Sequence, residues 1–395
     1  MARNLYDANR QWATRPDDER FSSLSEMLDA CKGFAASATT AIVPTSSLRV
    51  EVGDRDNLAL TAGDSKGAII GNYAFGQLAR LAKAPADYLT RLPAKLAADN
   101  LNSGLVQDST DRVNVLFHNS GRLARAITTD SYDRVWDHEV IEKVAMRLAD
   151  QGWVVPPARP ARSGQAGTRP ATEADILPNQ GDFGLAVKVG DPIAPAGLYA
   201  SDHDMFAFLV NHADPVWDGA KFLNRGLFAS NSEVGDGGLS LTVFTYDNVC
   251  GNHIVWGVSK CAKVSVRHRK SDKLSSGQTL NRLISQWAVT LSEIPTASVI
   301  SEQIQAAKTH EIAASKDQVL EALVKFAKVK GLSKLSSKVL SAGYEIAAST
   351  PRYGAPTTVW GMVNGLTEYS QTTGFADERA TFDAQAGRLM EIAVN

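Results

Sequence analysis

Cysteine is scarce in this chain of 395 residues, which contains only Cys31, Cys250 and Cys261. Three widely separated thiols cannot all pair, so a scaffold stapled by disulfides is excluded and a reducing compartment is expected. Long apolar runs are also missing. No stretch approaches the ~18 consecutive apolar residues that span a bilayer, and the first 20 residues contain no apolar core of a signal peptide. We therefore expect a cytoplasmic protein with no membrane association.

Excess charge of one sign is absent as well, because the formal net charge is −2. The chain as a whole is not a polycation, so any contact with nucleic acid must come from a local cluster of positive charge. Three motifs are also absent: GxxxxGK[ST], a GxGxxG that opens a helix, and the GxSxG elbow. These absences argue against a P-loop nucleotide hydrolase and an α/β-hydrolase. We expect no cofactor, and a non-catalytic protein is favoured over an enzyme.

The patterns that are present indicate an α+β protein. Predicted strands and helices mix up to about residue 270, and only helices follow, which gives a mostly helical C-terminal third. Short β-like runs at 221–229, 239–246 and 260–268, followed by an amphipathic helix at 275–292, predict an antiparallel β-meander, a β-β-β-α unit packed with helices. The run VCGNHIVWG (residues 249–257) is either a further strand or a long crossing.

Composition shifts suggest five regions. They are an N-terminal arm and short helix (1–35), an α+β subdomain (36–155), a flexible loop rich in Pro, Gly and Arg (156–182), the β-meander with its helix (183–295), and a helical region (296–395). In the first region, Ser22 or Ser23 is a plausible N-cap and Gly33 a plausible helix stop. In the second, we predict hairpins at 48–60 and 112–130 and a helix that Asp137 caps.

The stretch from 260 to 273 is the one part of the meander that offers chemistry to a ligand. It contains six basic residues and a single acid, Asp272. In an extended strand Lys263, Arg267 and Arg269 share one face, and Val264 and Val266 share the other. A positive stripe of this kind suits a sugar–phosphate backbone, although a charged edge strand that blocks aggregation is the alternative. The residues that we expect to contact nucleic acid are Lys260, Lys263, Arg267, Arg269, Lys270, Arg225, Asn252, Tyr246 and Trp256.

Two metal sites can be drawn from the sequence, and neither is favoured. Cys250 and His253 have CxxH spacing, with Cys261 and His268 nearby, but positions i and i+3 of a strand face opposite sides. The carboxylates of Glu233, Asp236 and Asp247 could serve a metal-dependent nuclease. However, two of them lie in the glycine-rich stretch NSEVGDGG, which is better explained as a hairpin turn.

Several stretches resemble a known family. They are GRLARAITTDSYDRVWDHEVIEKV, SDHDMFAFLVN, GLFASNSEVGDGGLSLTVFTYDNVCGNHIVWG with a following RHR, and TTVWGMVNGLTEYSQ. From about residue 40 to residue 372 the chain resembles the phage- and plasmid-borne family called domain of unknown function 932. That resemblance implies a phage, prophage or plasmid context and carries over no catalytic residues. At the level of fold alone, the β-β-β-α unit with a basic strand is similar to single-strand-annealing recombinases of the Rad-fifty-two type.

The function expected from these observations is binding and annealing of single-stranded DNA in phage-type recombination or replication, without ATP. The partners would be single-stranded nucleic acid and further copies of the chain, in a ring or a filament, in the cytoplasm of the host. Two alternatives stay open. One is a non-catalytic host-takeover or anti-defence protein that binds another protein, and the other is the metal-dependent nuclease.

Overall fold

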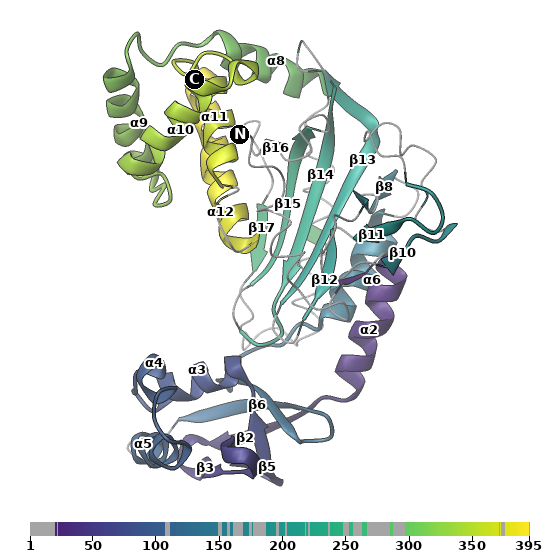
Figure 1. The fold of residues 1–395 in the computed structure, drawn as a ribbon, viewed down its shortest axis with the longest axis vertical. Coiled ribbons are helices and arrows are strands. Elements are labelled where there is room, and N and C mark those ends of the chain that lie inside the picture. The colour runs from purple at the N-terminus through teal and green to yellow at the C-terminus, as the bar shows by residue number, and fades with distance from the viewer. Residues whose placement is uncertain are drawn as a thin grey trace.

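The computed structural model contains two main β-sheets that meet end to end, with helices against each, and a further three-stranded sheet (Figure 1). It describes residues 20–21, 23–106, 111–148, 152–155, 159–160, 169–173, 176, 187–194, 197–201, 204–217, 219, 222–235, 238–247, 253–255, 263–266, 285–286, 297–370, 372 and 376–394. Helices and antiparallel sheets make up separate layers, so the fold belongs to the α+β class as predicted.

The large sheet is an antiparallel meander of long strands, β13 (Met205–Trp217), β14 (Phe222–Asn231) and β15 (Leu239–Asp247). Two short strands, β16 (His253–Val255) and β17 (Lys263–Val266), both pair with the outer side of β15 at different positions. The sheet is extended on the other side by β12 (Leu198–Ala200), β1 (Arg20–Phe21) and β8 (Trp153–Val154). The predicted strands at 221–229, 239–246 and 260–268 are therefore present, and VCGNHIVWG contributes a strand.

The small sheet has the strand order β2-β6-β7-β5-β4-β3. Its strands are β2 (Thr39–Pro44), β3 (Arg49–Val52), β4 (Leu58–Ala62), β5 (Ser65–Ile70), β6 (Arg112–His118) and β7 (Leu123–Thr129). Both predicted hairpins, β3–β4 and β6–β7, form. Only β5 and β7 run parallel. We call the small sheet and its helices, residues 39–129, the small-sheet unit.

Helices bury one face of each sheet. Helices α3 (Asn72–Leu81), α4 (Ala86–Leu89) and α5 (Ala94–Val106) share a hydrophobic core with the small sheet. Helices α2 (Leu24–Ala36) and α6 (Asp137–Leu148) share a core with β13, β14 and β15. Helices α4 and α5 are separate, and Pro93, which lacks a backbone N–H, lies between them.

The C-terminal helices form a third core, which reaches Val216 and Leu223 at one end of the large sheet. They are α8 (Ala297–Thr309), α9 (Lys316–Lys330), α10 (Ser337–Ser349), α11 (Val359–Ser370), α12 (Ala376–Gly387) and α13 (Glu391–Val394). Helices α10 and α11 cross closely at Gly343 and Gly365, where a Cβ on Gly365 would lie 2.1 Å from the carbonyl oxygen of Gly343. Within the described residues, no helix is both long enough and apolar enough to cross a membrane.

Parts of the 156–182 segment differ from the flexible loop that we expected. Strands β9 (Arg159–Pro160) and β10 (Arg169–Pro170) pair with β11 (Pro192–Ala194) in a sheet of their own. Ala171 of this segment packs with Val187 and Ile193, which follow it in the chain, in a small buried cluster. The rest of the segment, the arm before Arg20 and most of the predicted helix at 275–292 lie outside the described residues, although Ser285 and Gln286 are helical.

Helix α2 begins at the predicted Ser23, whose hydroxyl oxygen accepts a hydrogen bond of 3.1 Å from the backbone N–H of Glu26. The predicted stop at Gly33 is wrong, because the helix continues to Ala36 over the buried side chains of Met27 and Cys31. We expect Ser23→Ala to lower the free energy of unfolding by about 1 kcal/mol, since an N–H of the first turn loses its acceptor. Urea denaturation checks this value. A Ser23→Asp variant, which can still cap, should stay near the wild type, and an equal loss in both variants would contradict the capping role.

Candidate functional site

The residues that the sequence nominates for nucleic acid fall mostly outside the described part of the chain. Lys260, Arg267, Arg269, Lys270, Asn252 and Trp256 lie there, as do Asp236, Cys250, Cys261 and His268 of the metal-site hypotheses. The remaining three nominated residues lie in described strands: Lys263 in β17, Tyr246 in β15 and Arg225 in β14. Lys263 is opposite Thr242 in the β15–β17 pair, and Val264 and Val266 are opposite Leu241 and Leu239.

Strand register divides the three placed residues between two faces of the large sheet. Lys263 shares a face with Thr242 and Tyr246, because alternate residues of β15 belong to the same face. Arg225 is opposite Thr245 and so belongs to the other face. Lys263 and Tyr246 therefore occupy register positions on one face of the sheet, whereas Arg225 occupies a position on the other face. The expected contacts to nucleic acid are thus not confined to one face.

The C-terminal helices cover part of the outer edge of the large sheet, at β16. Helices α11 and α12 lie against β16, on the outer side of β15 (Figure 1). Strand β17 is paired with the opposite end of β15, at Leu239–Thr242, next to the turn that connects β14 and β15. The basic stretch 260–273 contains β17 at this end of β15.

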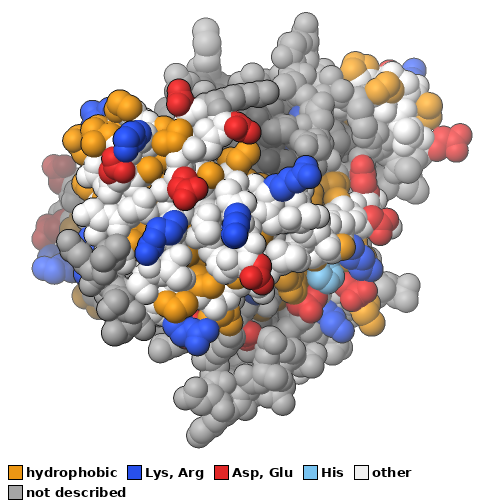
Figure 2. Space-filling model, turned by 90° about the horizontal axis from the view of Figure 1, so that it is seen from below, with side chains coloured by type: hydrophobic (Ala, Val, Ile, Leu, Met, Phe, Trp, Pro, Cys, Tyr) orange, Lys and Arg blue, Asp and Glu red, His pale blue; other side chains and the backbone are white. Residues whose placement is uncertain are grey.

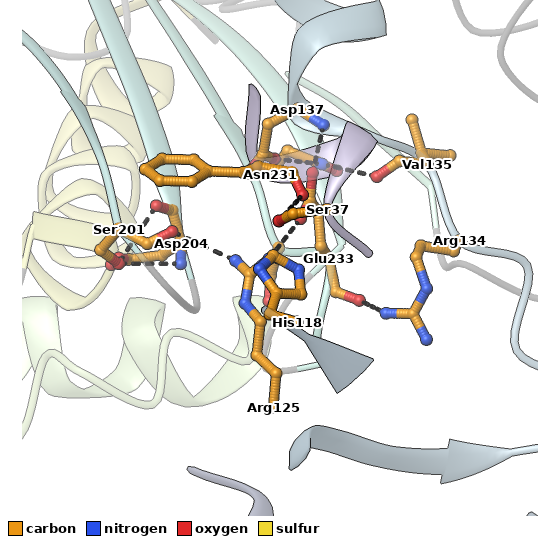
Figure 3. A network of polar contacts seen from close by, with 12 residues as sticks. Ser37, His118, Arg125, Arg134, Val135, Asp137, Ser201, Asp204, Asn231 and Glu233 are labelled. Carbon is orange, nitrogen blue, oxygen red and sulfur yellow. Dashed lines mark hydrogen bonds and ion pairs between the residues drawn. The ribbon is translucent and has the colours of Figure 1, made fainter. Parts of the chain in front are cut away.

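The connection between β14 and β15 is the main polar site of the described structure. Residues 231–235, which we call the docking turn, project from the large sheet into the small-sheet unit (Figure 3). The carboxylate of Glu233 accepts a hydrogen bond at Oε2 from Arg125 Nη1 at 2.7 Å, and at Oε1 from the backbone N–H of Asp137 at 2.8 Å. Glu233 therefore caps helix α6 from a distant segment, where a negative charge also suits the helix dipole.

The guanidinium of Arg125 has further polar contacts besides Glu233. Arg125 lies in the middle of β7, is 3% exposed, and also donates to the carbonyl oxygen of Ser201 at 3.1 Å. Its Nη1 lies 3.0 Å from Nε2 of His118. Because arginine can only donate, this nitrogen of His118 is the acceptor. The buried ion pair thus joins β6, β7 and the docking turn.

Two side chains of the 130–137 segment donate hydrogen bonds to the main chain of the docking turn. Tyr132 donates its hydroxyl to the carbonyl oxygen of Ser232 at 2.8 Å, and Arg134 donates to the carbonyl oxygen of Glu233. The guanidinium of Arg134 lies over the rings of Tyr132 and Trp136, 5.4 and 5.8 Å from their centroids. These contacts fix the backbone path of the turn as well as its carboxylate.

An apolar contact and one glutamine complete the docking. Val234 is fully buried against Leu116 and Ala126 on the second face of the small sheet. Gln77 of α3 donates to the carbonyl oxygen of Val234 at 2.8 Å and accepts from the backbone N–H of Ile127 at 2.6 Å. Strand β5 pairs with β7 only as far as Ala124, so the amide of Gln77 takes the place of a neighbouring strand at Ile127.

Asp137 carries the clearest electrostatic perturbation. Burial raises the pKa of its carboxyl well above its usual range, and repulsion from Glu233 adds to the rise, while the hydrogen bond from Asn231 and the charge of Arg125 oppose it. Asn231 donates from Nδ2 to Asp137 Oδ1 at 2.7 Å and to the carbonyl oxygen of Val135 at 2.9 Å. A carbonyl only accepts, so the orientation of this amide is fixed.

The docking contact is not fully satisfied. Among the described residues of this contact, Oδ1 of Asn231 and Nη2 of Arg134 are buried without a hydrogen-bond partner. Each such group costs about 1–3 kcal/mol relative to a satisfied one. The contact is therefore less stable than a well-paired core of the same size, which makes it a candidate for reversible opening.

The nuclease hypothesis is wrong for Glu233. Both oxygens of its carboxylate are engaged by Arg125 and by α6, and its side chain is 2% exposed. Asp247 is the last residue of the nine-residue strand β15, about 27 Å from the start of that strand at ~3.4 Å per residue. Two-metal catalysis needs its carboxylates around ions ~4 Å apart. Among the described residues, no three His, Cys, Asp or Glu side chains gather as a metal ion would require.

Cys31 is likewise not a reactive or ligating thiol. Its side chain lies on the buried side of α2, in the core shared with the large sheet. Burial raises the pKa of the thiol, and the charges of Asp137 and Glu233 add to the rise. A thiol of this kind stays protonated and inert at neutral pH.

Sequence reasoning missed Arg125, Asp137 and Glu233 as a group. It assigned Asp137 to an ordinary helix cap and explained the acidic residues of NSEVG by turn chemistry. The available signal was Arg125 itself, a charged residue between alanines in an apolar strand. Such a charge is rarely buried without a partner, but the sequence does not say which of many carboxylates provides it.

The end of the molecule formed by the small-sheet unit has mixed charge. Lys and Arg side chains alternate with Asp and Glu over the described part of this face (Figure 2). This part of the surface is not a positive field for nucleic acid.

A scan against models of protein families, a search of curated proteins and a search of solved structures each find no match to this chain.

Proposed function

We propose that this protein binds single-stranded DNA along the edge of its large sheet and promotes strand annealing without ATP. The observation that carries the proposal is strand β17 on the outer side of β15, with Lys263 and Tyr246 at register positions of one face. Four further basic residues, Arg267, Arg269, Lys270 and Lys273, follow β17 in the sequence. A cationic strand beside an aromatic position is the combination that holds a backbone while bases stack.

The proposal predicts salt-dependent binding of a labelled oligothymidylate, measured by fluorescence anisotropy without divalent metal. For single strands, the logarithm of affinity falls with the logarithm of salt concentration with a slope of about −0.7 per neutralised phosphate. Lys263→Glu with Arg267→Glu should weaken binding at every salt concentration and make the slope shallower by at least about 1.4, the share of two phosphates.

The matched control reverses two charges elsewhere. Lys325→Glu with Lys328→Glu changes two exposed lysines of α9, which we interpret as a solvated face, and should leave affinity and slope near the wild type. No binding at low salt would refute the proposal and favour a chain that acts through a protein partner. An effect of the α9 pair alone would place the DNA on the C-terminal helices instead.

A further inference from the structure

The docking turn places a buried ion pair beside a second buried carboxylate. Arg125 and Glu233 form a pair, and Asp137 lies beside them in the first turn of α6. The second arginine, Arg134, donates to the main-chain carbonyl of Glu233 and not to a carboxylate. Asp137 is 3% exposed, and its carboxylate accepts a hydrogen bond from the uncharged amide of Asn231, so among the described residues an ionised Asp137 would be a buried charge with no cation bonded to it.

We propose that the docking turn is a proton-controlled latch, which holds the small-sheet unit against the large sheet while Asp137 is protonated and loosens as Asp137 ionises. The latch is confined to residues 231–235 and their partners on β6, β7, α3 and the 130–137 segment. Because the turn lies where the two sheets meet, its opening frees one sheet from the other and leaves the C-terminal helices intact (Figures 1 and 3).

The charges on the elements packed around Asp137 do not cancel this effect. The described groups that face it are Glu233 and Asn231 of the docking turn, Arg125 of β7, His118 of β6, Asp204 before β13, Tyr132 and Arg134 of the 130–137 segment, and Cys31 of α2. Of these groups only the two arginines are cationic, and both already serve Glu233. Glu233 and Asp204 both disfavour ionisation of Asp137.

The direction of the pH effect follows from these contacts. Asp137 binds its proton more tightly in the closed latch than in the open one, so closing is favoured at low pH. The advantage is complete below the ordinary pKa of an aspartate, about 3.9, and is lost as pH rises through the raised value in the closed state. Across that interval the equilibrium constant for opening rises by up to ten-fold per pH unit, which corresponds to one proton released.

Hydrogen exchange of the intact chain from pH 5 to pH 9, corrected for intrinsic rates, tests the latch. We expect opening of the docking turn and of β7 to increase with pH in the wild type, while α9 and α10 keep their protection. In Asp137→Asn, which keeps an acceptor for Asn231 but cannot ionise, this increase should disappear. Glu142→Gln on the exposed side of the same helix is the control and should follow the wild type.

Three outcomes would overturn the proposal. They are an unchanged pH dependence in Asp137→Asn, an opening constant of the wild-type turn that is constant or falls with pH, and an equal loss of protection in α9 and α10, which would mean global unfolding. If Asp137→Asn does not fold, the wild-type profile alone decides between these outcomes. None of them depends on whether the protein binds DNA.

Discussion

Replacing Glu233 by alanine should lower the free energy of unfolding by about 3–5 kcal/mol, a large share of the 5–15 kcal/mol typical of a folded protein. The physical reason is the charge left behind. Arg125 would stay buried with no carboxylate, and the N–H of Asp137 at the start of α6 would lose its acceptor. Urea unfolding followed by circular dichroism measures the loss.

A double-mutant cycle separates the ion pair from general damage at the turn. We expect Arg125→Met and Glu233→Gln each to destabilise strongly, and the double variant to cost less than the sum, with an interaction energy toward the upper end of about 0.5–3 kcal/mol. The control is Glu142→Ala, which removes the exposed pair with Lys32 and should cost at most about 1 kcal/mol. Additive losses at positions 125 and 233 would show that the two side chains do not depend on each other.

Adding a methyl group at Gly365 should destabilise the C-terminal helices by about 2 kcal/mol, although alanine is the better helix former. The new Cβ would lie 2.1 Å from the carbonyl oxygen of Gly343 and 3.1 Å from the Cβ of Ala347. A backbone oxygen cannot rotate away, so α10 and α11 would have to move apart and lose the packing of their shared core.

The control for Gly365 has the opposite expected sign. Gly33 lies inside α2 with nothing within 4 Å of the place that a Cβ would take, so Gly33→Ala should stabilise the protein by about 0.5–1 kcal/mol. Thermal and urea unfolding of both variants test the pair. Stabilisation by both substitutions would mean that the two helices tolerate a wider separation than their close crossing implies.

Local patterns were sufficient to predict most elements of the fold. The β6–β7 hairpin follows from alternation around a turn, and α8, α9, α10 and α11 follow from apolar residues at helical spacing. Helix α12 was not predicted, because its buried side includes alanine and Asp383 next to a single large residue, Phe382. The stop at Gly33 failed because the buried contacts of α2 outweigh the preference of glycine for a helix end.

The candidate site was harder to predict, because its contacts join residues about a hundred positions apart. Nothing local in NSEVG distinguishes a solvated turn from one that inserts a carboxylate into another sheet. The parallel pairing of β5 with β7, which creates the place filled by Gln77, is equally invisible to local patterns. For nucleic acid, alternation within one strand predicted a shared face for Lys263, Arg267 and Arg269. It could not relate Lys263 to Tyr246 or to Arg225, because those relations depend on register across β14, β15 and β17.

The separation of 108 residues between Arg125 and Glu233 also affects the order of events during synthesis. At roughly 5–20 residues per second, a ribosome adds Glu233 about 5–20 s after Arg125. Over that interval the hairpin β6–β7 can form, but its central arginine has no carboxylate to neutralise it, and helix α6 has no acceptor for its first amide. Until residues 231–235 have been synthesised, the face of β6 and β7 that contacts them stays in water. The small-sheet unit can therefore complete its packing only after the β14–β15 connection has been made.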